Sequence, residues 1–333
     1  MAEQTIAFTQ GIEMPPDILA LIPQMKPEGF GLTILPPRVS REEVAAAMRD
    51  ADYLLGFVWF LPDEAYTEAK RLKLIQVLSA GYDMVNIAGA RKARVPICSN
   101  GGANSVAVAE HAIMLMLAVY RKLIAFHQNV SQGRWHRGIP RAVDIYELEG
   151  KTVGLVGFGN IGRQVARRVK AFDARVIYYD TFRPSRSDEV EMGVEYAPLN
   201  ELLEAADVVS LHVALNDDTR KLIGKAALER MKPKAILINT CRGEVVDEPA
   251  LIDALRSGRI LGAGLDTQEK EPPDETNPLL TLSNVVLTPH SAGPTLDSFR
   301  KRFYNGYANI QRVAQGLPPL WVIPEMRDLF PVG

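Results

Sequence analysis

Three side chains able to do chemistry follow three apolar runs in the second half of the chain. Arg242 follows AILINTC, Glu271 lies in the loop DTQEKEPP, and His290 follows NVVLTP. If these runs are parallel strands, their carboxyl ends meet at the sheet edge where open α/β proteins bind ligands. Each residue alone also has a plain explanation: an exposed loop cation, a solvated carboxylate, or a histidine satisfied within the core.

The three residue types together fit the reduction of a 2-oxo acid. Histidine titrates near neutral pH and can protonate a keto oxygen, and a nearby carboxylate keeps it protonated. Arginine binds a carboxylate through two parallel hydrogen bonds and never loses its charge. We therefore expect His290 as the acid/base, Glu271 as its partner and Arg242 as the carboxylate ligand, with His290 and Arg242 both contacting substrate. This chemistry requires no metal.

A glycine-rich segment after the run TVGLV indicates the source of the hydride. Gly157, Gly159 and Gly162 form the pattern G-x-G-x-x-G between a predicted strand and a predicted helix, with Asn160 inside the same turn. The glycines allow a tight turn, close approach to a pyrophosphate and close helix packing, while the helix N-terminus faces the anion. The alternative is a tight turn that needs small residues and binds nothing.

Asp180 ends the next predicted strand, RVIYYD. An acidic side chain there accepts hydrogen bonds from the hydroxyls of the adenine ribose and repels a 2′-phosphate, which favours NAD over NADP. Arg183 lies close enough in the sequence to soften this preference.

The predicted strands and helices that carry these residues form two alternating series. Short apolar runs separated by amphipathic segments predict an α/β protein with parallel sheets, because near-continuous apolar strands are buried on both faces. Residues 104–131 read as one long helical pattern, and a second long helix after Pro294 is expected to return to the first domain. The predicted strands lie at 5–8, 32–35, 53–57, 74–78, 95–99, 152–157, 175–180, 207–213, 235–240, 260–266 and 284–288.

The bulk composition narrows the class of protein. A chain of 333 residues suits two domains, and 38 basic against 40 acidic side chains give a net charge of -2, which disfavours nucleic-acid or membrane partners. Two cysteines, Cys98 and Cys241, cannot build a disulfide framework, so a reducing cytoplasm is expected. The chain shows neither a secretory signal pattern nor a long apolar span.

In combination, these motifs resemble the D-isomer-specific 2-hydroxyacid dehydrogenases. The resemblance covers about residues 78–319 and is carried by GKTVGLVGFGNIG, INTCRGEVVDEPALIDAL, GAGLD, and KEP followed by NVVLTPHSAG. It implies that Arg242, Glu271 and His290 are catalytic. It further implies cofactor contacts by Ile161, Thr240, Cys241 and Asp266, and substrate contacts by Ser79, Ala80 and Gly81. A strand-end cap is the alternative role for Asp266.

The resemblance also implies an architecture. A Rossmann NAD-binding domain at 103–294 would be inserted into a flavodoxin-like substrate domain made of 1–102 and 295–333. A homodimer through the NAD-binding domain and a small 2-oxo or 2-hydroxy acid substrate are expected.

Two other functions stay open at this point. A phosphite-type dehydrogenase is compatible with the three catalytic candidates, whereas formate-type relatives carry Gln where this chain has Glu271. An NAD-sensing binding protein of the corepressor type keeps the same three residues, although such proteins usually carry extra tails. The sequence does not name the hydroxy acid.

Overall fold

The computed structural model describes residues 3–11, 13–136 and 143–331, and the chain divides into two compact units. Unit 1 is Met1–Asn104 with Pro294–Gly333, and unit 2 is Ser105–Gly293. Unit 1 is therefore built from both ends of the sequence, and unit 2 is one continuous segment between them. In the described part of the chain, no helix is both long enough and apolar enough to cross a bilayer.

Unit 1 contains a parallel five-stranded sheet in the order β2-β1-β3-β4-β5, the flavodoxin-like order. Every predicted strand of this series is present. Their buried side chains form a single core with those of the helices. The strands are β1 (Gln4–Thr9), β2 (Phe30–Ile34), β3 (Tyr53–Gly56), β4 (Leu74–Val77) and β5 (Ile97–Cys98).

Helices flank the sheet of unit 1. The start of α2 is well specified, because Ser40 and Glu43 form a reciprocal capping box there. The helices are α1 (Pro16–Met25), α2 (Arg41–Asp50), α3 (Asp63–Glu68), α4 (Ile87–Ala93) and α12 (Leu296–Ala314), followed by the 3-10 helix η4 (Pro324–Met326).

Helix α12, from the far end of the sequence, is part of the core of unit 1. It packs against α1 and β4. A Cβ at Gly306 would lie 2.7 Å from Leu55 Cδ1, so the helix lies too close to β3 for a side chain there. Tyr307 Oη donates to the carbonyl of Ile22 at 2.7 Å, and Asn309 donates to the side chain of Gln76 at 2.7 Å. Contact clustering groups this helix with the first hundred residues in unit 1.

Unit 2 contains a parallel seven-stranded sheet in the order β12-β11-β10-β9-β6-β7-β8. The order reverses between β6 and β9, the kind of switch point at which such sheets bind ligands. The short strand β8 was not predicted, because two residues carry no readable periodicity. The strands are β6 (Thr152–Val156), β7 (Arg175–Tyr179), β8 (Glu195–Tyr196), β9 (Val208–Leu211), β10 (Ile236–Asn239), β11 (Gly262–Leu265) and β12 (Val285–Leu287).

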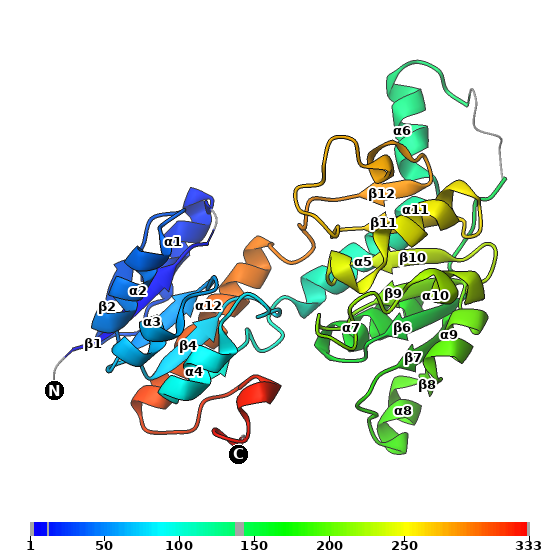
Figure 1. Cartoon of the computed structure of the whole chain (residues 1–333). Helices are drawn as coiled ribbons and strands as arrows, with labels where there is room; N and C mark the ends of the chain where they lie inside the picture. Colours follow the sequence, from blue (N-terminus) through cyan, green and yellow to red (C-terminus); the bar gives the residue numbers. More distant parts are fainter. Residues whose placement is uncertain (1–2, 12, 137–142, 332–333) are drawn as a thin grey trace. The chain divides into compact units, whose positions relative to one another are not determined.

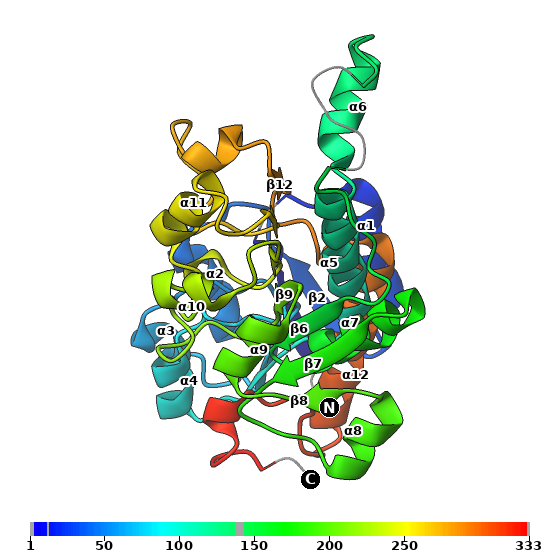
Figure 2. The same cartoon turned by 90° about the vertical axis from the view of Figure 1, so that its right-hand side faces the viewer.

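Helices cover both faces of this sheet, which makes it doubly wound as predicted (Figures 1 and 2). Helices α5 and α7 share one apolar core with the sheet, and α9, α10 and α11 share another. The helices are α5 (Ser105–Tyr120), α6 (Leu123–Ser131), α7 (Asn160–Val169), α8 (Arg186–Met192), α9 (Leu199–Ala205), α10 (Lys225–Arg230) and α11 (Glu248–Arg256). The 3-10 helices are η1 (Lys170–Phe172), η2 (Gly243–Val245) and η3 (Pro278–Thr281).

The long helical pattern at 104–131 corresponds to two helices, so its expected continuity is wrong. Lys122 has a left-handed backbone with φ 49° and separates α5 from α6. The apolar pattern runs on through the break, so periodicity could not reveal one left-handed residue. In both views α6 projects away from the sheet of its unit, beyond the end of α5.

Candidate active site

His290 and Glu271 form an ion pair near the ends of two neighbouring strands of unit 2. His290 follows β12, Glu271 follows β11, and His290 Nδ1 lies 2.7 Å from Glu271 Oε2. The side chains remain 46% and 35% exposed, so the histidine ring is accessible to a ligand. Burial raises the pKa of Glu271, but the hydrogen bond and charge of His290, together with the Gln268 amide and the charge of Arg242, outweigh it and leave that pKa below its ordinary value.

The backbone at His290 is held in an uncommon conformation. Its φ is 52°, in the left-handed region that a non-glycine residue adopts only when its surroundings require it. The buried carboxylate of Asp266 provides that requirement, since its Oδ1 accepts from the Ser291 amide and its Oδ2 from the Ala292 amide, both at 2.9 Å. The His290 amide donates to the Asp266 carbonyl at 2.8 Å. Asp266 thus fixes the loop that presents the histidine.

Two further side chains extend this anchor, and sequence reasoning had missed both. Thr288 Oγ1 donates to Asp266 Oδ1 at 2.6 Å, and His111 Nε2 lies 2.9 Å from Thr288 Oγ1. Because the hydroxyl proton is given to Asp266, Thr288 accepts from His111, which places a proton on Nε2 of His111. The available signal was a threonine directly after an apolar strand. His111 lies on α5, distant in sequence, and gave no signal.

Arg242 follows β10, the strand next to β11. Buried Asn239 supports the turn: its side chain donates to the Arg242 carbonyl at 2.8 Å and accepts from the Cys241 amide at 3.0 Å. A Cβ at Gly243 would lie 1.9 Å from the Gln268 backbone, so this turn packs directly on the loop that carries Glu271. The charge of Arg242 contributes to the lowered pKa of Glu271. The structure therefore brings Arg242, Glu271 and His290 to one edge of one sheet.

The glycine pattern spans the turn after β6 and the first turn of α7, because the helix begins at Asn160, earlier than predicted. Gly157 has φ 101°, and a Cβ there would lie 2.5 Å from the His212 carbonyl beyond β9. A Cβ at Gly162 would lie 2.3 Å from the Gly157 carbonyl, whereas nothing lies within 4 Å of one at Gly159. Gly159 caps α7 without a side-chain hydrogen bond, and Asn160 begins the helix. A helix N-terminus whose cap has no side chain leaves its amides open, and this fits a pyrophosphate.

Three buried polar atoms near these strand ends support the same fit. Within the described residues, His212 Nδ1, Thr240 Oγ1 and Thr267 Oγ1 have no hydrogen-bond partner. They follow β9, β10 and β11, and unsatisfied buried polar atoms of this kind await a ligand or water. Thr240 was predicted to line the cofactor groove, whereas His212 was not among the predicted contacts. Burial raises the pKa of the neighbouring Cys241 thiol to about 11. Cys241, which was also predicted to contact the cofactor, is therefore an uncharged thiol near neutral pH.

Asp180 follows β7 and points at the glycine turn. Its Oδ2 accepts from the Phe158 amide at 2.5 Å, and its Oδ1 accepts from the Phe182 amide at 2.9 Å. Arg183 pairs with Glu189 on α8 at 2.6 Å. Of the other cofactor candidates, Ile161 is partly buried in the first turn of α7.

Ser79, Ala80 and Gly81 follow β4 and belong to unit 1, so they are not part of the cluster in unit 2. Ser79 Oγ donates to the Gly81 carbonyl at 2.5 Å, which holds this short turn closed.

Comparison with known proteins gives the context of this site. Residues 113–292 match the model of the D-isomer specific 2-hydroxyacid dehydrogenase, NAD binding domain. A glyoxylate reductase of Korarchaeum cryptofilum is 38% identical over 298 residues, which cover 88% of this chain and 89% of that protein.

Two solved structures show how far the fold extends. An acyclic imino acid reductase in complex with NADPH and D-Arg matches with a TM-score of 0.83 and 28% identity, covering 96% of this chain and 100% of that one. D-lactate dehydrogenase with NAD+ from Lactobacillus jensenii matches with a TM-score of 0.80 and 29% identity, covering 96% and 99%. With its doubly wound NAD-binding domain and these relatives, the chain belongs to the D-isomer specific 2-hydroxyacid dehydrogenase family and is an NAD-dependent oxidoreductase.

Proposed function

We propose that this enzyme reduces a small 2-oxo acid to its D-2-hydroxy acid, with His290 as the proton donor, Glu271 as its partner and Arg242 as the ligand of the substrate carboxylate. Bound NADH supplies the hydride. The single observation that carries the proposal is the pairing of Glu271 Oε2 with His290 Nδ1 at 2.7 Å on a half-exposed histidine.

Glu271 and His290 have different roles in proton transfer. A proton on Nδ1 binds the carboxylate, which leaves Nε2 to give its proton to the keto oxygen. The ionised carboxylate stabilises the imidazolium before transfer, and in the oxidation direction the neutral ring takes the proton back. The lowered pKa of Glu271 keeps this partner charged when the surroundings become more acidic.

Arg242 supplies binding and orientation. Its guanidinium can hold a carboxylate through two parallel hydrogen bonds, which would fix the 2-oxo carbon in one orientation. Ser79, Ala80 and Gly81 of unit 1 are proposed to offer backbone amides to the same carboxylate. We also propose that unit 1 is the substrate domain and unit 2 the cofactor domain.

The cofactor site is proposed to use the glycine turn and the strand ends. Gly157, Gly159, Asn160, Ile161 and Gly162 would surround the pyrophosphate, and Asp180 would bind the adenine ribose. Thr240, Cys241 and Asp266 would line the nicotinamide end, where the unsatisfied hydroxyl of Thr240 supports a polar contact.

A homodimer through unit 2 and a cytoplasmic location complete the proposal. Helix α6 exposes apolar side chains, with Leu123 and Val130 each 53% exposed and Trp135 beyond them 65% exposed, which suits burial by a second copy. Size-exclusion chromatography with light scattering tests this, since replacing Leu123 and Val130 by Glu should give monomers. Both cysteines are free thiols, which suits a reducing compartment.

The deciding experiment is a substrate panel with the wild-type enzyme and His290→Ala. We expect NADH oxidation with at least one of glyoxylate, hydroxypyruvate and pyruvate, and a fall in kcat of about 10²- to 10⁴-fold in the variant. Phosphite with NAD+ belongs in the same panel. Turnover of phosphite alone, or a variant kcat close to that of the wild type, would overturn the proposal.

A further inference from the structure

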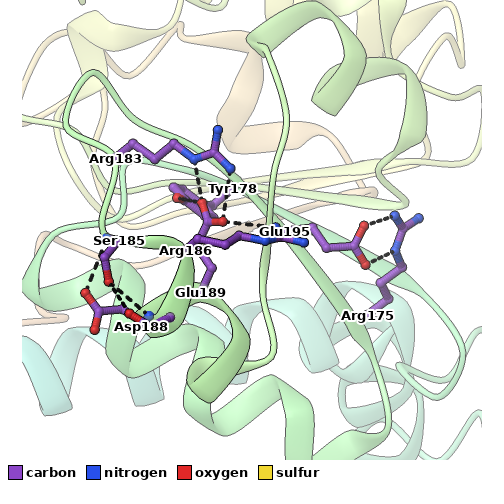
Figure 3. Close-up of polar contacts among 9 residues, drawn as sticks. Arg175, Tyr178, Arg183, Ser185, Arg186, Asp188, Glu189 and Glu195 are labelled. Carbon is purple, nitrogen blue, oxygen red and sulfur yellow. Dashed lines mark hydrogen bonds and ion pairs between the residues drawn. The ribbon is translucent and has the colours of Figure 1, made fainter.

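Glu189 on α8 is a charged side chain with no exposed surface. Its carboxylate accepts from Tyr178 Oη at 2.6 Å, from Arg183 Nε and Nη2 at 2.6 and 3.0 Å, and from Arg186 Nη1 at 3.1 Å (Figure 3). The hydrogen bonds from Arg183 and then Tyr178 lower the pKa of Glu189 to about 2. Burying a carboxylate costs free energy unless the group is paired and hydrogen-bonded. A role in keeping the surface of α8 polar therefore does not explain why Glu189 is buried.

Arg183 is held in one direction by two contacts. Its guanidinium lies over the ring of Tyr196 at 4.7 Å and makes two parallel hydrogen bonds to Glu189. Two planar contacts at once fix both the position and the plane of the group. Arg186, although 75% exposed, also turns toward the same carboxylate.

These arginines lie in the segment that follows Asp180 at the end of β7. NADPH differs from NADH by a phosphate on the ribose hydroxyl that such an aspartate binds, and a nearby arginine is the group that accommodates this phosphate. The related folds take either cofactor, as the NADPH and NAD+ complexes with TM-scores of 0.83 and 0.80 show. Cofactor choice in this chain must therefore lie in local side chains.

We propose that Glu189 is a positioning residue that favours NADH over NADPH by holding Arg183 and Arg186 away from the adenosine 2′ position. The inference rests on the proposed role of Asp180. Asp180 repels the 2′-phosphate, and Glu189 withholds the cations that could offset that repulsion. Discrimination against NADPH thus has two separable parts, and the second is carried by a residue that does not touch the cofactor.

The test is fluorescence titration of the full-length enzyme with NADH and with NADPH, with no 2-oxo acid present. In Glu189→Gln, which keeps the shape but removes the charge, the ratio of the NADPH to the NADH dissociation constant should fall about tenfold. The gain should shrink with added salt, because it comes from exposed charges. Adding Arg183→Met to this variant should return the ratio toward that of the wild type.

Two single variants keep the test decisive if Glu189→Gln folds poorly. Arg183→Met in the otherwise wild-type chain should leave the ratio within about twofold, since Arg183 is already engaged. Glu195→Gln is the matched control: it removes a carboxylate that pairs with Arg175 at 2.5 Å nearby, without touching Arg183, and should also leave the ratio unchanged.

The outcomes separate this inference from the proposed function. Tight NADH binding with an unchanged ratio in Glu189→Gln would overturn the role of Glu189 alone. A several-fold weaker NADPH affinity in Arg183→Met would also overturn it, because Arg183 would then already serve the phosphate. Failure of the wild type to bind either dinucleotide would overturn both proposals.

Discussion

Glu271 and Glu189 are both carboxylates paired with cationic partners in the same unit, yet their surroundings differ sharply. Glu189 has no exposed surface and pairs with two arginines and a tyrosine, whereas Glu271 is 35% exposed and pairs with one histidine and one backbone amide. Arginine keeps its charge at any working pH, so the Glu189 cluster is static. A histidine partner can gain and lose its proton, and its exposure lets a substrate reach it. The partner and its accessibility, more than the carboxylate itself, therefore decide between a structural and a reactive role.

Of the changes that bear on these two carboxylates, Glu271→Gln should have the strongest effect. The amide can still accept from Nδ1 of His290 but no longer stabilises the imidazolium, so kcat for reduction should fall about 10²-fold. Steady-state kinetics with the 2-oxo acid panel measure this fall. A kcat close to that of the wild type would place Glu271 with the structural carboxylates.

A smaller effect is expected from Asp266→Asn, which changes the buried carboxylate at the base of the histidine loop. An amide nitrogen would face the Ser291 or Ala292 amide, so one buried hydrogen bond is lost at a cost of about 1–3 kcal/mol in the free energy of unfolding. With the loop less fixed, kcat should fall about tenfold. Urea unfolding and initial rates measure these, and Thr288→Val should shift both in the same direction by less. Full activity in Asp266→Asn would show that the loop needs no anchor.

Stability rather than turnover should respond to Glu189→Gln. The pKa of Glu189 is lowered from 4.5 to about 2, so its ion pairs stabilise the fold fully above pH 4.5 and lose that contribution as the pH falls toward 2. The melting temperature of the variant should therefore lie below that of the wild type at pH 7, with the gap closing in acid. Thermal scans at several pH values measure the gap. An equal gap at every pH would assign it to packing instead.

The smallest effect is expected from Tyr178→Phe. This change removes one hydrogen bond to Glu189 but keeps the ring stacked on Phe158 at 4.1 Å and leaves both arginines in place. The melting temperature at pH 7 should fall by only a few degrees. A drop larger than that of Glu189→Gln would mean that the tyrosine, not the arginines, holds the cluster together.

The fold and the core of the candidate site were largely readable from the sequence. Strands buried on both faces appear in the sequence as short apolar runs, which made them easy to predict. The glycine pattern at the start of α7 could be recognised because a tight turn and close helix packing require glycine. Arg242, Glu271 and His290 could be predicted as one cluster because each follows a predicted strand, and the carboxyl ends of parallel strands meet at one side of a sheet. Their catalytic roles stay predictions until kinetics test them.

Other features escaped because their causes lie in three dimensions. The break at Lys122 depends on one left-handed residue inside an unbroken apolar pattern. Thr288 and His111 matter through contacts with Asp266 from distant segments. The sequence suggested that Arg183 softens the cofactor preference, but it could not show that buried Glu189 engages the guanidinium.

The placement of α12 has a consequence for how the newly made chain acquires its fold. Strands β3 and β4 emerge from the ribosome early, but the helix that covers Leu55 and bonds to Ile22 and Gln76 is translated only after the whole of unit 2. That interval lasts on the order of ten to forty seconds. Unit 2 is one continuous segment and can form its core during this interval. Unit 1, in contrast, keeps an apolar face exposed until α12 has been translated. Early chaperone binding should therefore concentrate on the first hundred or so residues of the nascent chain.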